Sequence, residues 1–215
     1  MYKFNYPKMN RVLDDIRAKL IEGVNFEEVI KLFGGSIFYF ENAMNSAKNL
    51  DDKLKVEYVN YFYEEIYNAA KDTNDLMLTC SISDLITENI NKRLDKKKVN
   101  PYFNLMIDML IINAISLFQA NILEGAKDYF TRAINLGDKY LKDSKKNYHD
   151  SLCCAYNWLG YLYFQEENYK ESLTYCERIM ELYNSVKDEE GFYCKEYDPT
   201  DVEEKIREIK KILND

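Results

Sequence analysis

Apolar residues recur every three or four positions along most of this chain, with charged and polar residues between them. The first segment to show this begins at Pro7 and carries Val12, Ile16 and Leu20 at intervals of four. The later segments keep a period near that of the α-helix, about 3.6 residues, and none of them favours a strand. We therefore predict an all-α chain.

Capping and turn residues divide the first hundred residues into several helices. Asn25 followed by Glu28 has the order of a capping box, in which two side chains satisfy free backbone N–H groups. Gly34-Gly35 is expected to separate a short helix from a longer one that runs from Ser36 to about Asn49. Further boundaries are predicted at Asp51-Asp52 and at the turn Thr73-Asn74-Asp75.

A segment in the second half of the chain has the pattern of a helix-turn-helix repeat. Leu159-Gly160 and Tyr163 lie on the first helix and Ser172 on the second, and the small residues let two antiparallel helices approach closely. This order of Leu-Gly, Tyr and then a small residue resembles the tetratricopeptide repeat, and the resemblance covers residues 153–184. Such repeats bury their apolar faces against neighbouring repeats.

The segment before it has the same register. It supplies the second-helix pattern of small, aromatic and small residues that is typical of the family: Ala126, Phe130 and Ala133. The later segment departs from that pattern at Cys176 and Ile179. Ala114 and Gly160 are 46 residues apart (160 − 114), and the same offset relates Leu117 to Tyr163, Ala126 to Ser172, and Phe130 to Cys176.

This offset exceeds the simplest tetratricopeptide period, ~34 residues, by about 12, which we assign to the stretch from Gly137 to Ser151. The added length resembles the long-helix variants found in peptide-sensing regulators and motor-associated adaptors. The resemblance implies a right-handed solenoid of antiparallel helix pairs with about nine or ten helices. The predicted regions are a repeat-like helical region over 1–100, two long repeats over 101–187, and a loop with a C-terminal capping helix over 188–215.

Two boundaries leave alternatives open. Asn100-Pro101 marks a helix start, and it is either a domain boundary or a loop within a continuous solenoid. After Asp198-Pro199, Thr200 and Glu203 have the T-x-x-E order that starts a helix with a narrow apolar stripe. That last helix is expected to cap the solenoid, and coiled-coil dimerisation is the alternative, although two heptads are few.

Composition and charge limit the classes of partner and the cellular compartment that we expect for this chain. A net charge of −8 disfavours nucleic acid, because the long-range field repels a phosphate backbone. The one basic run, residues 92–98, is expected to be a solvated helix end, with a docking patch as the alternative. Five cysteines without a C-x-x-C spacing indicate reduced thiols and a cytoplasmic protein. No stretch is long and apolar enough to be expected to cross a membrane.

The sequence predicts a protein that is not an enzyme and holds no metal or cofactor. Its single histidine, His149, lies in a polar linker, where exposure to solvent is the simpler interpretation than catalysis. Cys153-Cys154 opens a helix, where the dipole lowers a thiol pKa, but no basic residue stands nearby in sequence. Glycine-rich phosphate loops and acidic calcium loops are absent from the sequence.

In the family, the first helix of each pair lines a concave surface that holds a protein or peptide partner. By register, the corresponding residues are Asp108, Ile111 and Ile115 in the earlier repeat, and Cys154, Asn157, Tyr161, Phe164 and Gln165 in the later one. The amide of Asn157 both donates and accepts hydrogen bonds, as an extended peptide backbone requires. The alternative is that Tyr161 and Phe164 pack on the following helix.

These positions lack the Lys, Arg and Asn set of the repeats that clamp carboxylates of heat-shock chaperones. We therefore expect an interaction scaffold or adaptor that binds a rather apolar peptide or helix of a partner protein. A peptide-sensing regulator that changes curvature is the second hypothesis. An enzyme or RNA-binding factor with an unrecognised N-terminal site is the third.

Overall fold

Helices account for the regular structure of the described residues, as the apolar spacing predicts. The computed structural model describes residues 7–22, 26–46, 51–92, 102–140, 149–186 and 198–214, and within these ranges it has nine helices and no strand. The helices are α1 (Pro7–Ile21), α2 (Phe26–Ser46), α3 (Asp52–Asp72), α4 (Leu76–Lys92), α5 (Phe103–Gln119), α6 (Leu123–Tyr140), α7 (His149–Gln165), α8 (Tyr169–Val186) and α9 (Pro199–Asn214). None of these helices combines the length and hydropathy that crossing a bilayer requires.

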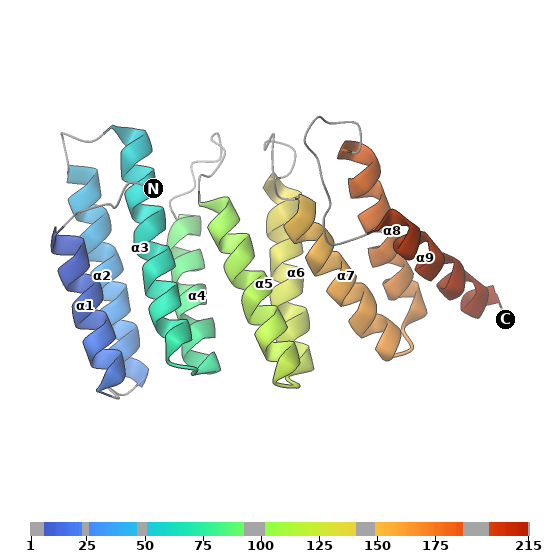
Figure 1. Ribbon diagram of the computed structural model, residues 1–215, viewed down its shortest axis with the longest axis horizontal. Coiled ribbons are helices and arrows are strands. Elements are labelled where there is room, and N and C mark those ends of the chain that lie inside the picture. The colour runs from blue at the N-terminus through green and yellow to red at the C-terminus, as the bar shows by residue number, and fades with distance from the viewer. Residues whose placement is uncertain are drawn as a thin grey trace. The chain divides into compact units, whose positions relative to one another are not determined.

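The chain divides into two compact units, Met1–Met109 and Leu110–Asp215, and the division falls within α5. In the first unit, α1 to α4 pack against one another (Figure 1). Each turns inward a pair of apolar residues three or four positions apart: Leu13 and Ile16, Phe33 and Ile37, Phe62 and Ile66, and Ile82 and Ile86. The predicted boundary at Asn100-Pro101 and the capping residue Asn25 lie outside the described residues.

Helix α2 runs without a break through Gly34-Gly35, so the predicted division into two helices is wrong. Two glycines in a helix cost about 2 kcal/mol relative to alanine. Phe33 and Ile37 flank them and are buried on the inward face. Burying two such side chains is worth roughly 3–6 kcal/mol, so packing outweighs the local preference.

Acidic side chains cap three of the helices, and in α4 the capping residue is Asp75, which accepts a hydrogen bond from the Leu78 N–H at 3.0 Å. The Asp51 carboxylate accepts a hydrogen bond from the Leu54 N–H at 2.8 Å, so α3 starts where the sequence predicts. In α9 the carboxylate of Asp198 accepts from the Thr200 N–H at 2.8 Å, and the helix begins at Pro199. The start of α9 therefore lies one residue before Thr200, because the fixed φ of proline suits the first helical position.

Three helical hairpins, α3–α4, α5–α6 and α7–α8, close through turns of equal length and similar shape. Each turn has three residues, and the middle residue has a positive φ: Asn74 (57°), Asn121 (61°) and Glu167 (60°). In the last two turns the following residue donates its N–H five positions back, which is the Schellman arrangement. These bonds are Ile122 to the Leu117 carbonyl (2.8 Å) and Asn168 to the Tyr163 carbonyl (2.9 Å).

The turns repeat at a nearly constant spacing. Asn121 and Glu167 are 46 residues apart (167 − 121), and Asn74 and Asn121 are 47 apart (121 − 74). The α3–α4 hairpin therefore follows the register of the later two, although its residues do not fit the sequence template. Large and small residues have exchanged helices in it: Tyr67 corresponds to Ala114 and Gly160, and Ser83 to Phe130 and Cys176.

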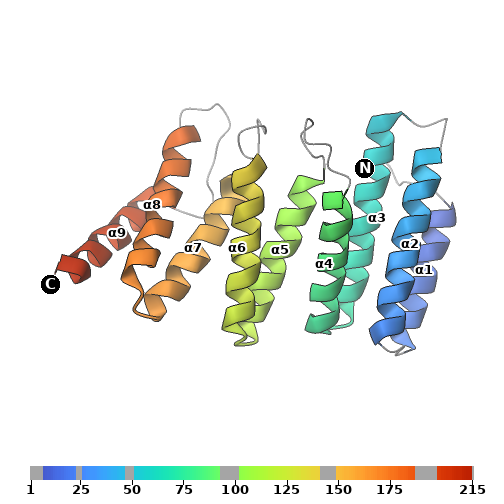
Figure 2. The same ribbon diagram turned by 180° about the vertical axis from the view of Figure 1, so that it is seen from behind.

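In the second unit, α7 packs on α6, α8 on α7, and α9 on α8 (Figures 1 and 2). The predicted small pair joins α7 to α8, since the Ser172 hydroxyl donates to the Gly160 carbonyl at 2.7 Å. An added Cβ at Gly160 would still be 3.5 Å from its nearest neighbour, an ordinary contact. Of the described glycines, Gly137 of α6 leaves the least room, because an added Cβ would lie 2.1 Å from a side-chain carbon of Leu152 on α7.

Candidate functional site

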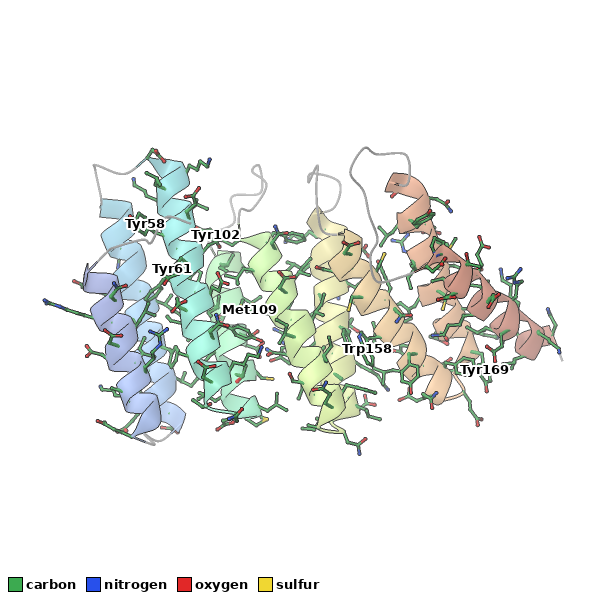
Figure 3. The ribbon with its side chains drawn as sticks, viewed as in Figure 1. Tyr58, Tyr61, Tyr102, Met109, Trp158 and Tyr169 are labelled. Carbon is green, nitrogen blue, oxygen red and sulfur yellow. The ribbon has the colours of Figure 1, made fainter. Side chains whose placement is uncertain are left out.

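Helix α7 presents an aromatic residue to solvent at the position that the register selects. Tyr161 is 39% exposed. Its ring meets Phe118 of α5 edge-on at a centroid distance of 6.2 Å and Trp158, one turn earlier on α7, at 6.1 Å. The ring centroids of Phe118 and Trp158 are themselves 4.8 Å apart, and both residues are half-buried. Trp158 is labelled on α7 in Figure 3. The three rings form one aromatic cluster, of which Tyr161 is the exposed member.

The other predicted partner-binding residues differ in how accessible they are. Ile111 is buried, and Ile115, Cys154 and Asn157 are half-buried. Phe164 meets Tyr169, the first residue of α8, edge-on at 5.3 Å, which is the kind of contact expected if Phe164 packs on the following helix. Gln165 is exposed. Asp108 is also exposed and belongs to the first unit, two residues before the division within α5.

Asn157, Tyr161 and Gln165 form a polar column along α7, because each follows the last by four residues. Among the described residues, no hydrogen bond is made by the side chains of Asn157 and Gln165 or by the Tyr161 hydroxyl. Two amides and one phenol are therefore available to a ligand. Together they offer both donors and acceptors along one side of the helix.

Lys205 of α9 joins this surface, and the sequence did not identify it. Its ammonium lies 5.9 Å from the centre of the Tyr161 ring, within the range of a cation–π interaction. Within the described ranges it forms no ion pair with a carboxylate. The repeat spacing could have suggested it, since Lys205 follows Trp158 by 47 residues (205 − 158), the offset between the first two turns.

Helix α9 fixes Lys205 in place by packing on α8. Val202 and Ile209 are buried on its inward face, and Lys210 pairs with Glu177 of α8 at 2.8 Å. Residues on its outward face, including Glu203, Arg207 and Lys211, are exposed. This distribution of apolar and charged residues is that of a helix packed on one side only.

A lysine with two carboxylate partners joins α6 to the end of α7. The Lys127 ammonium contacts Glu124 at 2.8 Å and Glu166 at 2.5 Å, and it lies 5.5 Å from the centre of the Tyr163 ring. Desolvation lowers the pKa of Lys127, but the hydrogen bonds to Glu124 and Glu166 outweigh it and leave the pKa raised. The charged lysine therefore helps to hold the turn of α7 that follows Tyr161.

A second polar contact joins α6, α7 and α8. The Tyr156 hydroxyl donates to the Asp138 carboxylate at 2.9 Å, and Arg178 approaches the same carboxylate at 3.7 Å. Burial and the hydrogen bond to Asp138 raise the pKa of Tyr156 to about 12, so the phenol is neutral at physiological pH. Both contacts hold α7 against α6 and α8, and neither of them involves Asn157.

Metal ligands and thiols can be examined among the described residues. These residues contain no cluster of three or more side chains able to hold a metal ion. Burial raises the pKa of the Cys176 thiol, which disfavours the reactive thiolate. Residues 93–98 of the basic run, and Cys194, lie outside the described residues, and the side chain of His149 is not described.

No protein-family model matches the chain, and no curated protein matches it significantly. A solved structure titled "Crystal structure of BtubC (BKLC) from P. vanneervenii" is similar to it. The two sequences are 13% identical over 97% of this chain and 82% of the other, with a TM-score of 0.48. A TM-score at this level does not establish a shared fold.

Proposed function

We propose that the chain is a non-enzymatic protein-interaction scaffold built as a right-handed solenoid of tetratricopeptide-like helix pairs. The similar turns of the three hairpins and their offsets of 46 and 47 residues support this architecture. If the array continued beyond α9, a further helix would pack on the α9 residues that lie 47 positions after Tyr156, Gly160 and Tyr163 of α7. These residues are Glu203, Arg207 and Lys210. Charged residues at these positions fit a terminal cap better than a further hairpin.

The partner is a peptide or helix of another protein, and its binding surface is centred on Tyr161. One observation carries this proposal: an exposed tyrosine stands on a cluster of two further rings, beside side chains that make no hydrogen bonds among the described residues. Aromatic residues on such a support contribute large contact areas at low entropic cost. The half-buried Phe118, whose ring meets that of Tyr161, supplies apolar area next to it.

The test compares partner recovery by matched variants. Tyr161→Ala and Asn157→Ala alter the proposed surface, and Asn135→Ala removes an exposed amide from α6 as the control. Each tagged protein is used for affinity purification from the native cell with quantitative mass spectrometry, after circular dichroism has shown an intact fold. The expected result is a set of proteins that the control variant retains and both surface variants lose. Equal recovery by all three proteins would show that this face is not the binding surface.

A peptide-sensing regulator is the second candidate, favoured by the long repeat. Helices of 17 to 21 residues form the three hairpins, so a small tilt of one hairpin displaces the far ends of its helices by a large distance. A bound peptide that tilts neighbouring hairpins would change the radius of gyration measured by solution X-ray scattering. An identical scattering profile with and without a saturating peptide would count against regulation by curvature and leave the scaffold proposal intact.

A further inference from the structure

The side chains around Tyr161 discriminate between the two kinds of ligand that the proposed scaffold could bind. A helix has satisfied its own backbone hydrogen bonds, so it docks through apolar side chains and offers few partners to polar groups. An extended segment carries unpaired backbone N–H and C=O groups that need partners. The uncommitted polar groups of Asn157, Tyr161 and Gln165 therefore suit the second kind of ligand.

The spacing of the column agrees with an extended ligand. Residues four apart on an α-helix are separated by about 6 Å along its axis. Alternate residues of an extended chain are separated by about 6.6 Å. A segment lying along α7 thus brings successive backbone amides, two residues apart, to Asn157, Tyr161 and Gln165 in turn.

A helix on the same surface would bury these groups without partners. An unpaired buried amide lowers affinity by roughly 5- to 150-fold. Two amides and a phenol left unpaired would weaken a helical ligand more than the exposed part of one tyrosine ring could compensate. The column favours a ligand that forms hydrogen bonds with it.

Charge adds a second requirement. Lys205 brings a positive charge against Tyr161, and no carboxylate among the described residues pairs with it. Several other cations of the second unit have a carboxylate partner, for example Lys127 with Glu124 and Glu166, and Lys210 with Glu177. In a chain with a net charge of −8, an unneutralised cation on the candidate surface is complementary to a carboxylate of the ligand.

We infer that the surface formed by Asn157, Tyr161 and Gln165 of α7 with Lys205 of α9 binds an extended acidic peptide segment rather than a helix. The inference rests on the proposed function and adds the conformation and charge of the ligand. The ligand backbone follows α7 and forms hydrogen bonds with the amides. An Asp or Glu side chain reaches Lys205 from the position opposite Tyr161.

The experiment uses the full chain and a phage-displayed library of random 12-residue peptides as the probe. Selected peptides are synthesised with a fluorescent label, and their affinities are measured by fluorescence anisotropy. We expect an Asp or Glu to be enriched at one position and proline to be tolerated at several others, since a helix excludes proline. Asn157→Ala and Gln165→Ala should each lower affinity about fivefold, the loss of one hydrogen bond.

Two lysine variants isolate the charge. Lys205→Glu and Lys170→Glu both change the net charge from −8 to −10, so any long-range effect is shared, and Lys170 is exposed on α8. Lys205→Glu should weaken the acidic peptides about tenfold or more, whereas Lys170→Glu should change their affinity less than twofold. Lys205→Met retains the aliphatic stem, so it repeats the test without a charge reversal if Lys205→Glu disturbs α9.

The outcomes separate this inference from the proposed function. Selected peptides that are helical, lack acidic residues and bind Lys205→Glu normally would overturn the inference, while their sensitivity to Tyr161→Ala would preserve the scaffold proposal. A failure to enrich any peptide that depends on Tyr161 or Asn157 would overturn both.

Discussion

Gly137 is the position where the packing of α6 against α7 is most easily tested. An ideal Cβ at this glycine would lie 2.1 Å from the Leu152 Cδ2 atom and 2.8 Å from its Cγ atom. Leu152 is fully buried, so its side chain cannot move into solvent. Gly137→Ala gains about 1 kcal/mol in helix propensity. Forcing a methyl group into filled space costs roughly 1–3 kcal/mol, so we expect a net loss of about 1 kcal/mol.

The assay follows urea unfolding by the fluorescence of Trp158, the only tryptophan of the chain. It lies in α7 and therefore reports on the second unit. With a urea slope of about 2 kcal/mol per M, a loss of 1 kcal/mol lowers the midpoint by about 0.5 M. Gly125→Ala is the control on the same helix, because its Cβ would meet the exposed and movable Ile122 at 3.3 Å. We expect it to raise the midpoint, through helix propensity alone.

A double-mutant cycle identifies the cause of the loss. Leu152→Ala should cost about 2–5 kcal/mol in the parent protein, since it empties a fully buried site. In the Gly137→Ala background the same change should cost at least about 1 kcal/mol less, because the new methyl group occupies the vacated space. Additive effects, or a Gly137→Ala variant as stable as Gly125→Ala, would refute the close approach of α6 and α7.

Three further changes test the turn, the polar contact and the cap. Glu167→Gly should stabilise the second unit by about 0.5–1 kcal/mol in the urea assay, because glycine adopts a φ of 60° without strain, whereas Glu167→Ala should give no such gain. Tyr156→Phe should cost about 1 kcal/mol at pH 8. Its folded pKa of about 12 exceeds the ordinary 10.0, so the hydroxyl stabilises fully below pH 10 and the difference from wild type should shrink between pH 10 and 12; a constant difference would contradict this. Ile209→Ala should weaken the docking of α9 by about 2–5 kcal/mol, because it removes a fully buried side chain. Amide hydrogen exchange should then become faster in α9 than in α7, whereas equal acceleration in both helices would show that α9 does not open separately.

Helix positions were largely predictable, because they depend on local features of the sequence. A period near 3.6 marks one buried face, and residues such as Asp51 and Pro7 determine where helices start. The predicted helix break at Gly34-Gly35 is wrong because the two glycines disfavour a helix by only about 2 kcal/mol, and the burial of Phe33 and Ile37 outweighs this local preference. The sequence template did not identify the α3–α4 hairpin, because a large residue on one helix and a small residue on the other can exchange places and still fill the same volume.

The candidate site was predictable only in part. Register selected Tyr161, Asn157 and Gln165, because residues four apart share one side of a helix. The register alone could not predict that Tyr161 is exposed and Phe164 is half-buried, because exposure depends on which part of a neighbouring helix lies opposite each ring. Lys205 was not identified from the sequence, because its place beside the Tyr161 ring depends on how α9 packs.

By itself, the sequence determined that the chain is helical, where most helices begin and end, and that residues 114 and 160 share a register 46 positions apart. These properties follow from periodicity and backbone chemistry, which act over a few residues. Only the tertiary structure decided that Gly137 of α6 lies directly against Leu152 of α7 and that α9 brings Lys205 to Tyr161. Such contacts join residues far apart in the chain, and they depend on the volumes and charges of both partners at once.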